Sequence, residues 1–150
     1  MSVTLLTGDG RKFSVPLDLA QTSKTIADLL EDIGGSLTDD VVPLPNVRAS
    51  TMDQIIAFWT RAMETSPANP WAAIDGFVDE LPMTTVCDLI VAANYLDMQP
   101  FLDGLCKYIA ALIKDKNTEQ IREVLEIEND FEPEEEARIR AENAWAFADP

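Results

Sequence analysis

The sequence predicts an α+β fold in which a small sheet packs with helices, and three observations support this class. Residues 3–7 and 12–16 are short β-prone runs on either side of Gly8-Asp9-Gly10, whose composition is typical of a hairpin turn. Residues 41–45 form another β-prone run, and its prolines predict an edge strand, because proline cannot donate a hydrogen bond inside a sheet. After Ser50 most apolar residues recur at helical spacing, so the rest of the chain is predicted to be mainly helical.

Two short helical segments are expected between the hairpin and the edge strand. Asp18 and Gln21 have the spacing of a capped helical turn. Residues 25–33 carry their large apolar side chains at helical spacing. Gly34-Gly35 predicts the end of this helix, since glycine readily adopts the left-handed backbone that terminates helices.

The middle of the chain is predicted to hold one long helix followed by an irregular connection. Ser50 is the expected N-cap of the helix, which runs to about Glu64. Residues 66–80 contain Pro67 and Pro70 and show no clear period. Because apolar residues recur throughout them, they are interpreted as a connection within one domain and not as a domain boundary.

Two apolar helices should follow. Thr85 with Asp88 predicts the start of the first, which reaches Leu96, and its apolar residues surround nearly the whole circumference, so a central position is expected. Pro100 suits the first turn of the second, over residues 101–114. Its apolar sector is roughly 160° wide, more than the roughly 100° that one packing face requires. Either this helix is sunk deeply in its own core, or the excess contacts something else.

The closing segment is predicted to form two helices that are incomplete by themselves. Asn117 and Gln120 have the spacing of a capping box, and Pro133 suits the first position of the last helix. Both helices carry too few large apolar residues to build a core. Phe131, Trp145 and Phe147 should nevertheless be covered, so a partner is expected to cover them.

Charge and composition restrict the partners. A chain of 150 residues with 47% apolar residues can form one globular domain, and its net charge of −16 opposes binding to nucleic acid or an anionic membrane. The acidic run at 119–142 is interpreted as a solvated helical face. With no basic leader and no long apolar stretch, a cytoplasmic or nuclear protein is expected.

The residues for most enzymatic chemistry are missing. The chain has 0 histidines, which excludes Ser-His and Cys-His nucleophile pairs and histidine-containing zinc sites. Cys87 and Cys106 lie in apolar helical patterns and are predicted to be buried, reduced thiols. No catalytic residue, metal or cofactor is predicted, and only chemistry based on carboxylates alone remains open to an enzyme.

Three strings carry a resemblance to a known family. They are VPLPNV at 42–47, LIVAANYLD at 89–97, and the set EQIR at 119–122, IENDF at 127–131 and PEEEARIRAENAW at 133–145. With the opening hairpin, they make the chain similar over nearly its whole length to the S-phase kinase-associated adaptor family. Members link a cullin to an F-box protein in SCF ubiquitin ligases. The third set is the most discriminating, because other BTB/POZ folds lack this extension.

The resemblance implies a division of labour along the chain. Residues 1–114 would form a BTB/POZ domain, and residues 115–150 a two-helix extension that completes the F-box-binding surface. Asn94 and Tyr95 match the family's cullin-binding pair, although the residues alone also allow Asn94 to be a satisfied core amide. The F-box-binding positions implied are Cys106, Ile109, Ile113, Ile121, Val124, Leu125, Ile127, Phe131, Ile139, Asn143 and Trp145.

The resemblance also implies a candidate modification and shows departures from the family. In some protists the family's proline at the position of Pro133 is hydroxylated and glycosylated, so Pro133 is a candidate modification site. Glu132 stands where a threonine N-cap is common, which predicts a weaker helix start. The Asp that usually follows the family's tryptophan is absent after Trp71.

The function implied is that of a non-enzymatic adaptor joining a cullin scaffold to F-box substrate receptors for ubiquitin-dependent degradation. The alternative is a BTB-type scaffold that self-associates, as a homodimer when free, or binds F-box proteins without a cullin. Both share one fold, so the fold alone does not separate them.

Overall fold

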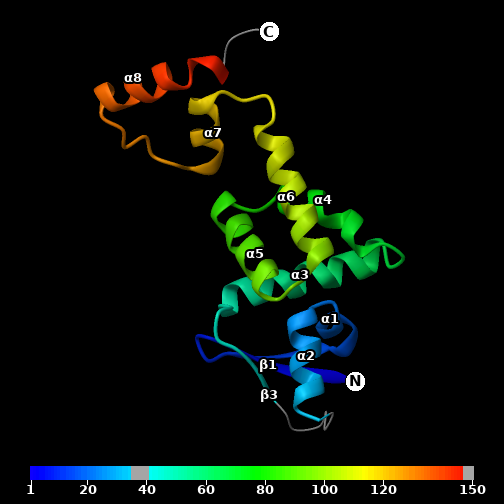
Figure 1. Cartoon of the computed structure of the whole chain (residues 1–150). Helices are drawn as coiled ribbons and strands as arrows, with labels where there is room; N and C mark the ends of the chain where they lie inside the picture. Colours follow the sequence, from blue (N-terminus) through cyan, green and yellow to red (C-terminus); the bar gives the residue numbers. More distant parts are fainter. Residues whose placement is uncertain (35–40, 147–150) are drawn as a thin grey trace. The chain divides into compact units, whose positions relative to one another are not determined.

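The computed structural model describes residues 1–34 and 41–146 (Figure 1). The chain divides into two compact units, Met1–Asp115 and Lys116–Pro150, whereas the sequence suggested a domain boundary after residue 114. Gly35, half of the predicted helix stop, and Phe147, one of the aromatic residues expected to be covered by a partner, lie outside the described residues. Gly34 has a φ of 83°, the left-handed backbone expected of such a stop.

A three-stranded sheet opens the first unit. Strands β1 (Ser2–Thr7) and β2 (Lys12–Pro16) form the predicted antiparallel hairpin, and β3 (Val41–Leu44) pairs with β1 in parallel. The strand order β2-β1-β3 places β3 at an edge, which confirms the prediction drawn from its prolines. Leu5, Val15 and Val42 are almost completely buried, and they give the sheet one core-facing side.

The hairpin turn is fixed by contacts with the segment after β3. The Gly8 N–H donates to the Val47 carbonyl at 2.9 Å, and a Cβ at Gly8 would collide with the carbonyl oxygen of Pro45. In the same turn, the Asp9 carboxylate accepts a hydrogen bond from the Thr7 hydroxyl at 2.6 Å. The residues of this turn therefore close the hairpin and also pack against the segment around Pro45 and Val47.

Helix α3 (Ala49–Thr65) has a different cap from the predicted one. Ser50 lies inside the helix, and the Asp9 carboxylate accepts the Ala49 backbone N–H at 3.0 Å. The prediction of a Ser50 cap was wrong because a carboxylate from the hairpin turn takes that role. The predicted helix itself is confirmed.

The two short helices α1 (Leu17–Gln21) and α2 (Lys24–Asp32) form where predicted. Asp18 makes no capping hydrogen bond, so that part of the prediction was wrong. The Ser23 hydroxyl caps α2 by accepting the Ile26 N–H at 3.1 Å, and it also donates to the Leu96 carbonyl at 2.5 Å. Ser23 therefore joins the start of α2 to a segment more than seventy residues later.

The segment predicted to be irregular is partly helical. A 3-10 helix, η1 (Pro70–Ala73), leads into α4 (Ile74–Val78), and Ile74, Phe77 and Val78 are buried. Pro70 begins η1, where its missing N–H is not needed. The segment lies inside the first unit, as expected of a connection within one domain, but it is more regular than predicted because burial of these side chains orders the backbone.

An aromatic cluster holds the helices of the first unit together. The Phe58 ring lies 4.8 Å from Phe101 and 5.5 Å from Phe77, centroid to centroid, and Trp71 stacks on Phe58 at 6.2 Å. Helix α5 (Met83–Tyr95) packs against α3 and α6 (Gln99–Ile113), and α6 packs against α4 (Figure 1). Such aromatic packing anchors α6 at its first turn.

The second unit contains α7 (Thr118–Leu125), α8 (Pro133–Glu142) and η2 (Ala144–Ala146). The predicted capping box is confirmed: Asn117 Oδ1 accepts the Gln120 N–H at 2.9 Å, and Gln120 Oε1 accepts the Asn117 N–H at 3.0 Å. Glu126 ends α7 in the left-handed conformation, with a φ of 56°. Glu132 makes no side-chain cap at the start of α8, in line with the weaker start expected there.

Candidate protein-docking surfaces

Hydrogen bonds from residues at the start of α2 hold the end of α5 in place. The Thr25 hydroxyl donates to the Tyr95 carbonyl at 2.9 Å, next to the bond from Ser23 to Leu96. Asp97 then takes a φ of 48°, and the Met98 N–H returns to the Ala93 carbonyl at 3.0 Å, which terminates the helix. These bonds use backbone carbonyls, so the side chains at this helix end stay available.

Asn94 and Tyr95 lie on this anchored helix end. Asn94 is exposed, which removes the alternative of a core amide, and Tyr95 is partly buried against the core. A tyrosine with a supported ring and a partly accessible edge is a common anchor in protein interfaces.

An exposed stripe continues along α5 from Asn94. Val91 is 67% exposed and Cys87 is exposed, and the spacing of Cys87, Val91 and Asn94 puts them on one helical face. The expected central position of α5 was therefore wrong, because only the face with Val86, Leu89, Ala92 and Ala93 is buried. The sequence did not single out Val91, since an apolar residue at an interface and one in a core look alike in a hydrophobicity pattern.

The predicted residues of α6 are in mixed positions. Cys106 is exposed, Ile113 is half-buried, and Ile109 is half-buried and packs against the core. Both cysteines were predicted to be buried, and that prediction was wrong, because each lies on the solvent side of an otherwise apolar helix. Only Phe101 and Leu105 of α6 are fully buried, so the first unit covers only part of the wide apolar sector of this helix.

The second unit turns most of its apolar side chains outward. Trp145 is 77% exposed, Ile127 54% and Phe131 41%, and no residue in the range 116–146 is fully buried. Half-buried positions in this unit are Ile121, Val124, Leu125 and Ile139. Asn143 is exposed, and its side-chain amide donates to the Ile139 carbonyl at 2.8 Å. Large apolar groups that stay exposed in this way are typical of a binding surface.

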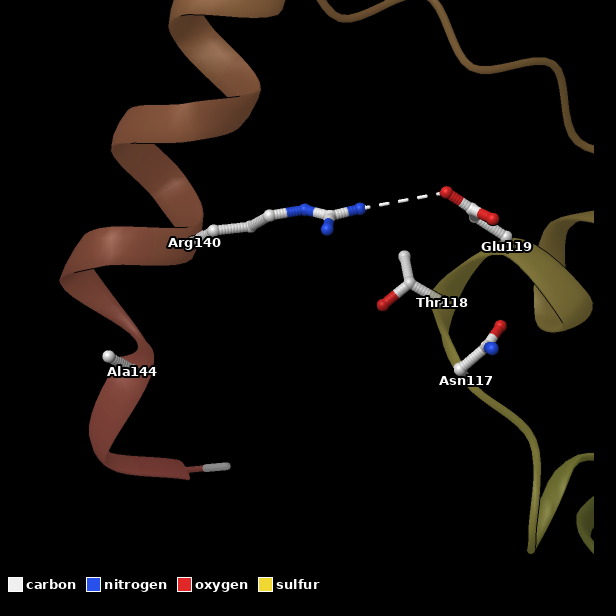
Figure 2. A pocket seen from close by; sticks show the side chains of 5 residues that line it. All are labelled: Asn117, Thr118, Glu119, Arg140 and Ala144. Carbon is white, nitrogen blue, oxygen red and sulfur yellow. Dashed lines mark ion pairs between the residues drawn. The ribbon is translucent and has the colours of Figure 1, made fainter. Parts of the chain in front are cut away.

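Two hollows lie between α7 and α8. The larger, about 540 Å³, is lined by Asn117, Thr118, Glu119, Arg140 and Ala144. Figure 2 shows Arg140 reaching from α8 toward Glu119 on α7, with an N–O distance of 3.9 Å, and Arg140 also pairs with Glu136 at 2.8 Å. The smaller hollow, about 220 Å³, has Phe131 and Ile139 in its wall beside Arg122 and Asn143.

These hollows were not predicted from the sequence. The i,i+4 pair of Glu136 and Arg140 was a readable local signal, but Glu119 comes from a different helix. The residues that line the two hollows include charged, polar and apolar types. Their mixture of apolar and charged groups fits protein side chains.

Two features are absent from the part of the chain that the structure describes. Over residues 1–34 and 41–146, no helix has the length and apolarity required to span a bilayer. In the same part of the chain, no group of three or more His, Cys, Asp or Glu side chains is arranged to hold a metal ion.

Family models match both ends of the chain. Residues 1–62 match the model described as the Skp1 family, tetramerisation domain, and residues 99–146 match the Skp1 family, dimerisation domain. The first model is a POZ domain, which agrees with the observed α+β fold and its small sheet.

Individual relatives are similar over nearly their whole length. The SCF ubiquitin ligase complex protein SKP1a of Dictyostelium discoideum is 36% identical over 154 residues, covering 95% of this chain and 94% of the relative. SKP1-like protein 11 of Arabidopsis thaliana is 38% identical, with 97% and 96% covered. The E3 ubiquitin ligase complex SCF subunit sconC of Aspergillus fumigatus is 36% identical, with 97% and 98% covered. From the two family models and these relatives, the chain belongs to the Skp1 family.

Proposed function

We propose that this chain is the adaptor subunit of an SCF-type cullin-RING ubiquitin ligase and bridges the cullin scaffold to F-box substrate receptors. The observation that carries the proposal is the similarity over nearly the whole chain to proteins named as subunits of SCF ligase complexes. The exposed faces of the two units give this role a physical basis, because an adaptor needs surfaces that its own folding leaves uncovered.

The cullin-binding surface in this proposal is the end of α5. Asn94 and Tyr95 provide the contact, and the hydrogen bonds from Ser23 and Thr25 keep the helix end rigid. A rigid, preformed contact loses little conformational entropy on binding, so more of the contact energy appears as affinity.

The F-box-binding surface is proposed on α6 and on the second unit. Its residues are Cys106, Ile109, Ile113, Ile121, Val124, Leu125, Ile127, Phe131, Ile139, Asn143 and Trp145. All of them are exposed or half-buried in the free chain. Apolar helical segments of a receptor would cover them and complete a shared core.

The chain acts by proximity in this proposal and performs no chemistry. Holding a receptor-bound substrate near the ubiquitin-transfer machinery makes the transfer effectively intramolecular. The absence of histidine from the sequence and the net charge of −16 support a role in binding proteins, without nucleic acid or membrane partners. We place the protein in the cytoplasm and the nucleus, and Pro133, which is exposed at the start of α8, is the proposed position of modification.

Reconstitution tests the proposal. The purified chain is mixed with a cullin N-terminal region and an F-box domain, and the mixture is separated by gel filtration with light scattering. A complex with the mass of all three components is expected. The self-associating alternative predicts a homodimer whose mass does not change when either component is added.

A further inference from the structure

The exposed apolar residues of the second unit are closely framed by carboxylates. Ile127 lies between Glu126 and Glu128, and Phe131 lies between Asp130 and Glu132. All four acidic residues are exposed. Neighbouring Cα atoms are about 3.8 Å apart, so these charges lie well within the Debye length of about 8 Å at physiological salt.

The residues Glu128, Asp130 and Glu132, here called the acidic rim, form no ion pair with any residue that the structure describes. In the described part of the second unit, the ion pairs all involve Arg140, with Glu119 and Glu136. Arg122 lies 5.9 Å over the Phe131 ring, and Arg138 lines a hollow together with Glu132, Glu134 and Glu135. These two positive charges are fewer than the carboxylates around them, so an excess of negative charge remains. Whatever covers Phe131 must therefore approach through a negative field.

Two hydrogen bonds hold the loop that carries the acidic rim, one to the side chain of Asn129 and one between backbone groups. Asn129 Oδ1 accepts the Phe131 N–H at 3.2 Å, and the Ile127 N–H returns to the Arg122 carbonyl at 2.8 Å. Phe131 also forms part of the wall of the 220 Å³ hollow, next to Ile139. The surface thus combines an apolar centre, a receptive hollow and a fixed negative border.

We propose that this surface selects F-box receptors whose docking segment has an apolar centre bordered by lysine and arginine. The inference rests on the proposed function and adds a rule for choosing among receptors. Complementary charge at the border of an interface mainly raises the association rate and suppresses partners of the same charge sign. The apolar contacts with Phe131 and Trp145 then set how long the complex lasts.

The test compares a rim variant with a matched control. The rim variant carries Glu128→Gln, Asp130→Asn and Glu132→Gln, which keeps Asn129 and every residue of the apolar centre. The control carries Asp18→Asn, Glu31→Gln and Glu64→Gln, three exposed positions of the first unit, so both variants change the net charge equally. The probes are two purified F-box domains, one with a surplus of Lys and Arg and one with a surplus of Asp and Glu.

Association rates are measured by stopped flow at about 0.01 M and about 1 M ionic strength, where the Debye lengths are about 30 Å and 3 Å. The rim variant should bind the basic F-box domain about tenfold more slowly than the wild type at low salt, with an unchanged dissociation rate. The control should bind at nearly the wild-type rate, and the difference between the variants should vanish at high salt.

The outcomes separate this inference from the proposed function. Equal rates for the rim variant and the control, with tight binding by both, would overturn the charge rule and leave the adaptor role intact. Faster binding of the acidic F-box domain than of the basic one would also overturn the rule. If the wild type bound neither domain, the proposed function itself would fail, and the inference with it.

Discussion

The Asp9 carboxylate accepts the Ala49 backbone N–H with its two oxygens at 3.0 and 3.2 Å, so a hairpin turn caps a helix that begins forty residues later. The bond connects the sheet to α3, the helix that carries Phe58 of the aromatic cluster. It also satisfies a backbone donor at a helix start, where no partner exists within the helix.

Replacing Asp9 with alanine should lower the urea midpoint of unfolding without changing the slope, because the native cap is lost. The Thr7 hydroxyl and then the Ala49 N–H hold the pKa of Asp9 below its ordinary value. The stabilisation by Asp9 should therefore be complete above about pH 5 and be lost as the pH falls through the lowered pKa. Urea titrations of both proteins at several pH values measure this difference.

The control for this prediction is Asp53→Ala, which removes the exposed ion pair with Arg11. An equal loss of stability in Asp53→Ala would contradict the capping role of Asp9.

Gly8→Ala should destabilise the protein by roughly 1–3 kcal/mol, because the new Cβ would collide with the backbone of Pro45. Gly76 in α4 provides the opposite case. A Cβ at Gly76 meets open space, so Gly76→Ala should stabilise the protein by roughly 0.5–1 kcal/mol through helix propensity. Chemical denaturation of the two variants checks the signs, and a loss of stability in both would refute the steric explanation.

Two of the three tryptophans, Trp71 and Trp145, should respond differently to truncation. Trp145→Ala should leave the unfolding free energy within about 0.5 kcal/mol of the wild type, because the side chain is 77% exposed. It should weaken binding to an F-box domain by about 2 kcal/mol or more, as measured by calorimetry. Trp71→Ala should instead lose about 2 kcal/mol or more of stability, since its ring stacks on Phe58. Unchanged F-box affinity in Trp145→Ala would remove Trp145 from the docking surface.

Substituting Asn94 by Ala and Tyr95 by Lys in one variant should weaken cullin binding at least tenfold and leave F-box binding unchanged. The Tyr95 carbonyl, which receives the Thr25 hydroxyl, is retained, so the helix end should stay in place. Calorimetric titration with each partner measures the two affinities. A parallel loss of both would show that the partners share one surface.

The two cysteines report on the proposed surfaces separately. Both thiols are exposed, Cys87 on α5 and Cys106 on α6, so both should react with iodoacetamide in the free chain. A bound F-box domain should slow alkylation of Cys106, and a bound cullin should slow alkylation of Cys87, as followed by peptide mass spectrometry. The single variants Cys87→Ser and Cys106→Ser assign each signal. Protection of both thiols by either partner alone would contradict separate surfaces.

Local patterns in the sequence predicted local structure well. The capping box of Asn117 and Gln120, the hairpin around Gly8 and the edge position of β3 are each encoded within a few residues. The α+β class was also predictable, because strand and helix periods occupy different parts of the chain. The family, recognised from three strings, was confirmed by the family models.

Features that depend on distant contacts were missed. The cap from Asp9 displaced the predicted Ser50, because a tertiary contact supplied a charged acceptor that no local rule includes. The parallel pairing of β1 with β3 and the ordered η1–α4 segment likewise depend on packing across the first unit. Val91 and Cys87 were misplaced in the interior because apolarity does not reveal whether the covering atoms belong to the same chain.

The lack of any fully buried residue between 116 and 146 has a consequence for how this protein diverges. Substitutions in a packed interior are removed by selection because the protein unfolds, whereas substitutions on an open surface are mostly tolerated by the fold. In this stretch selection therefore acts through the choice of partner. A duplicated copy can drift toward a new set of receptors here while every intermediate along the way still folds.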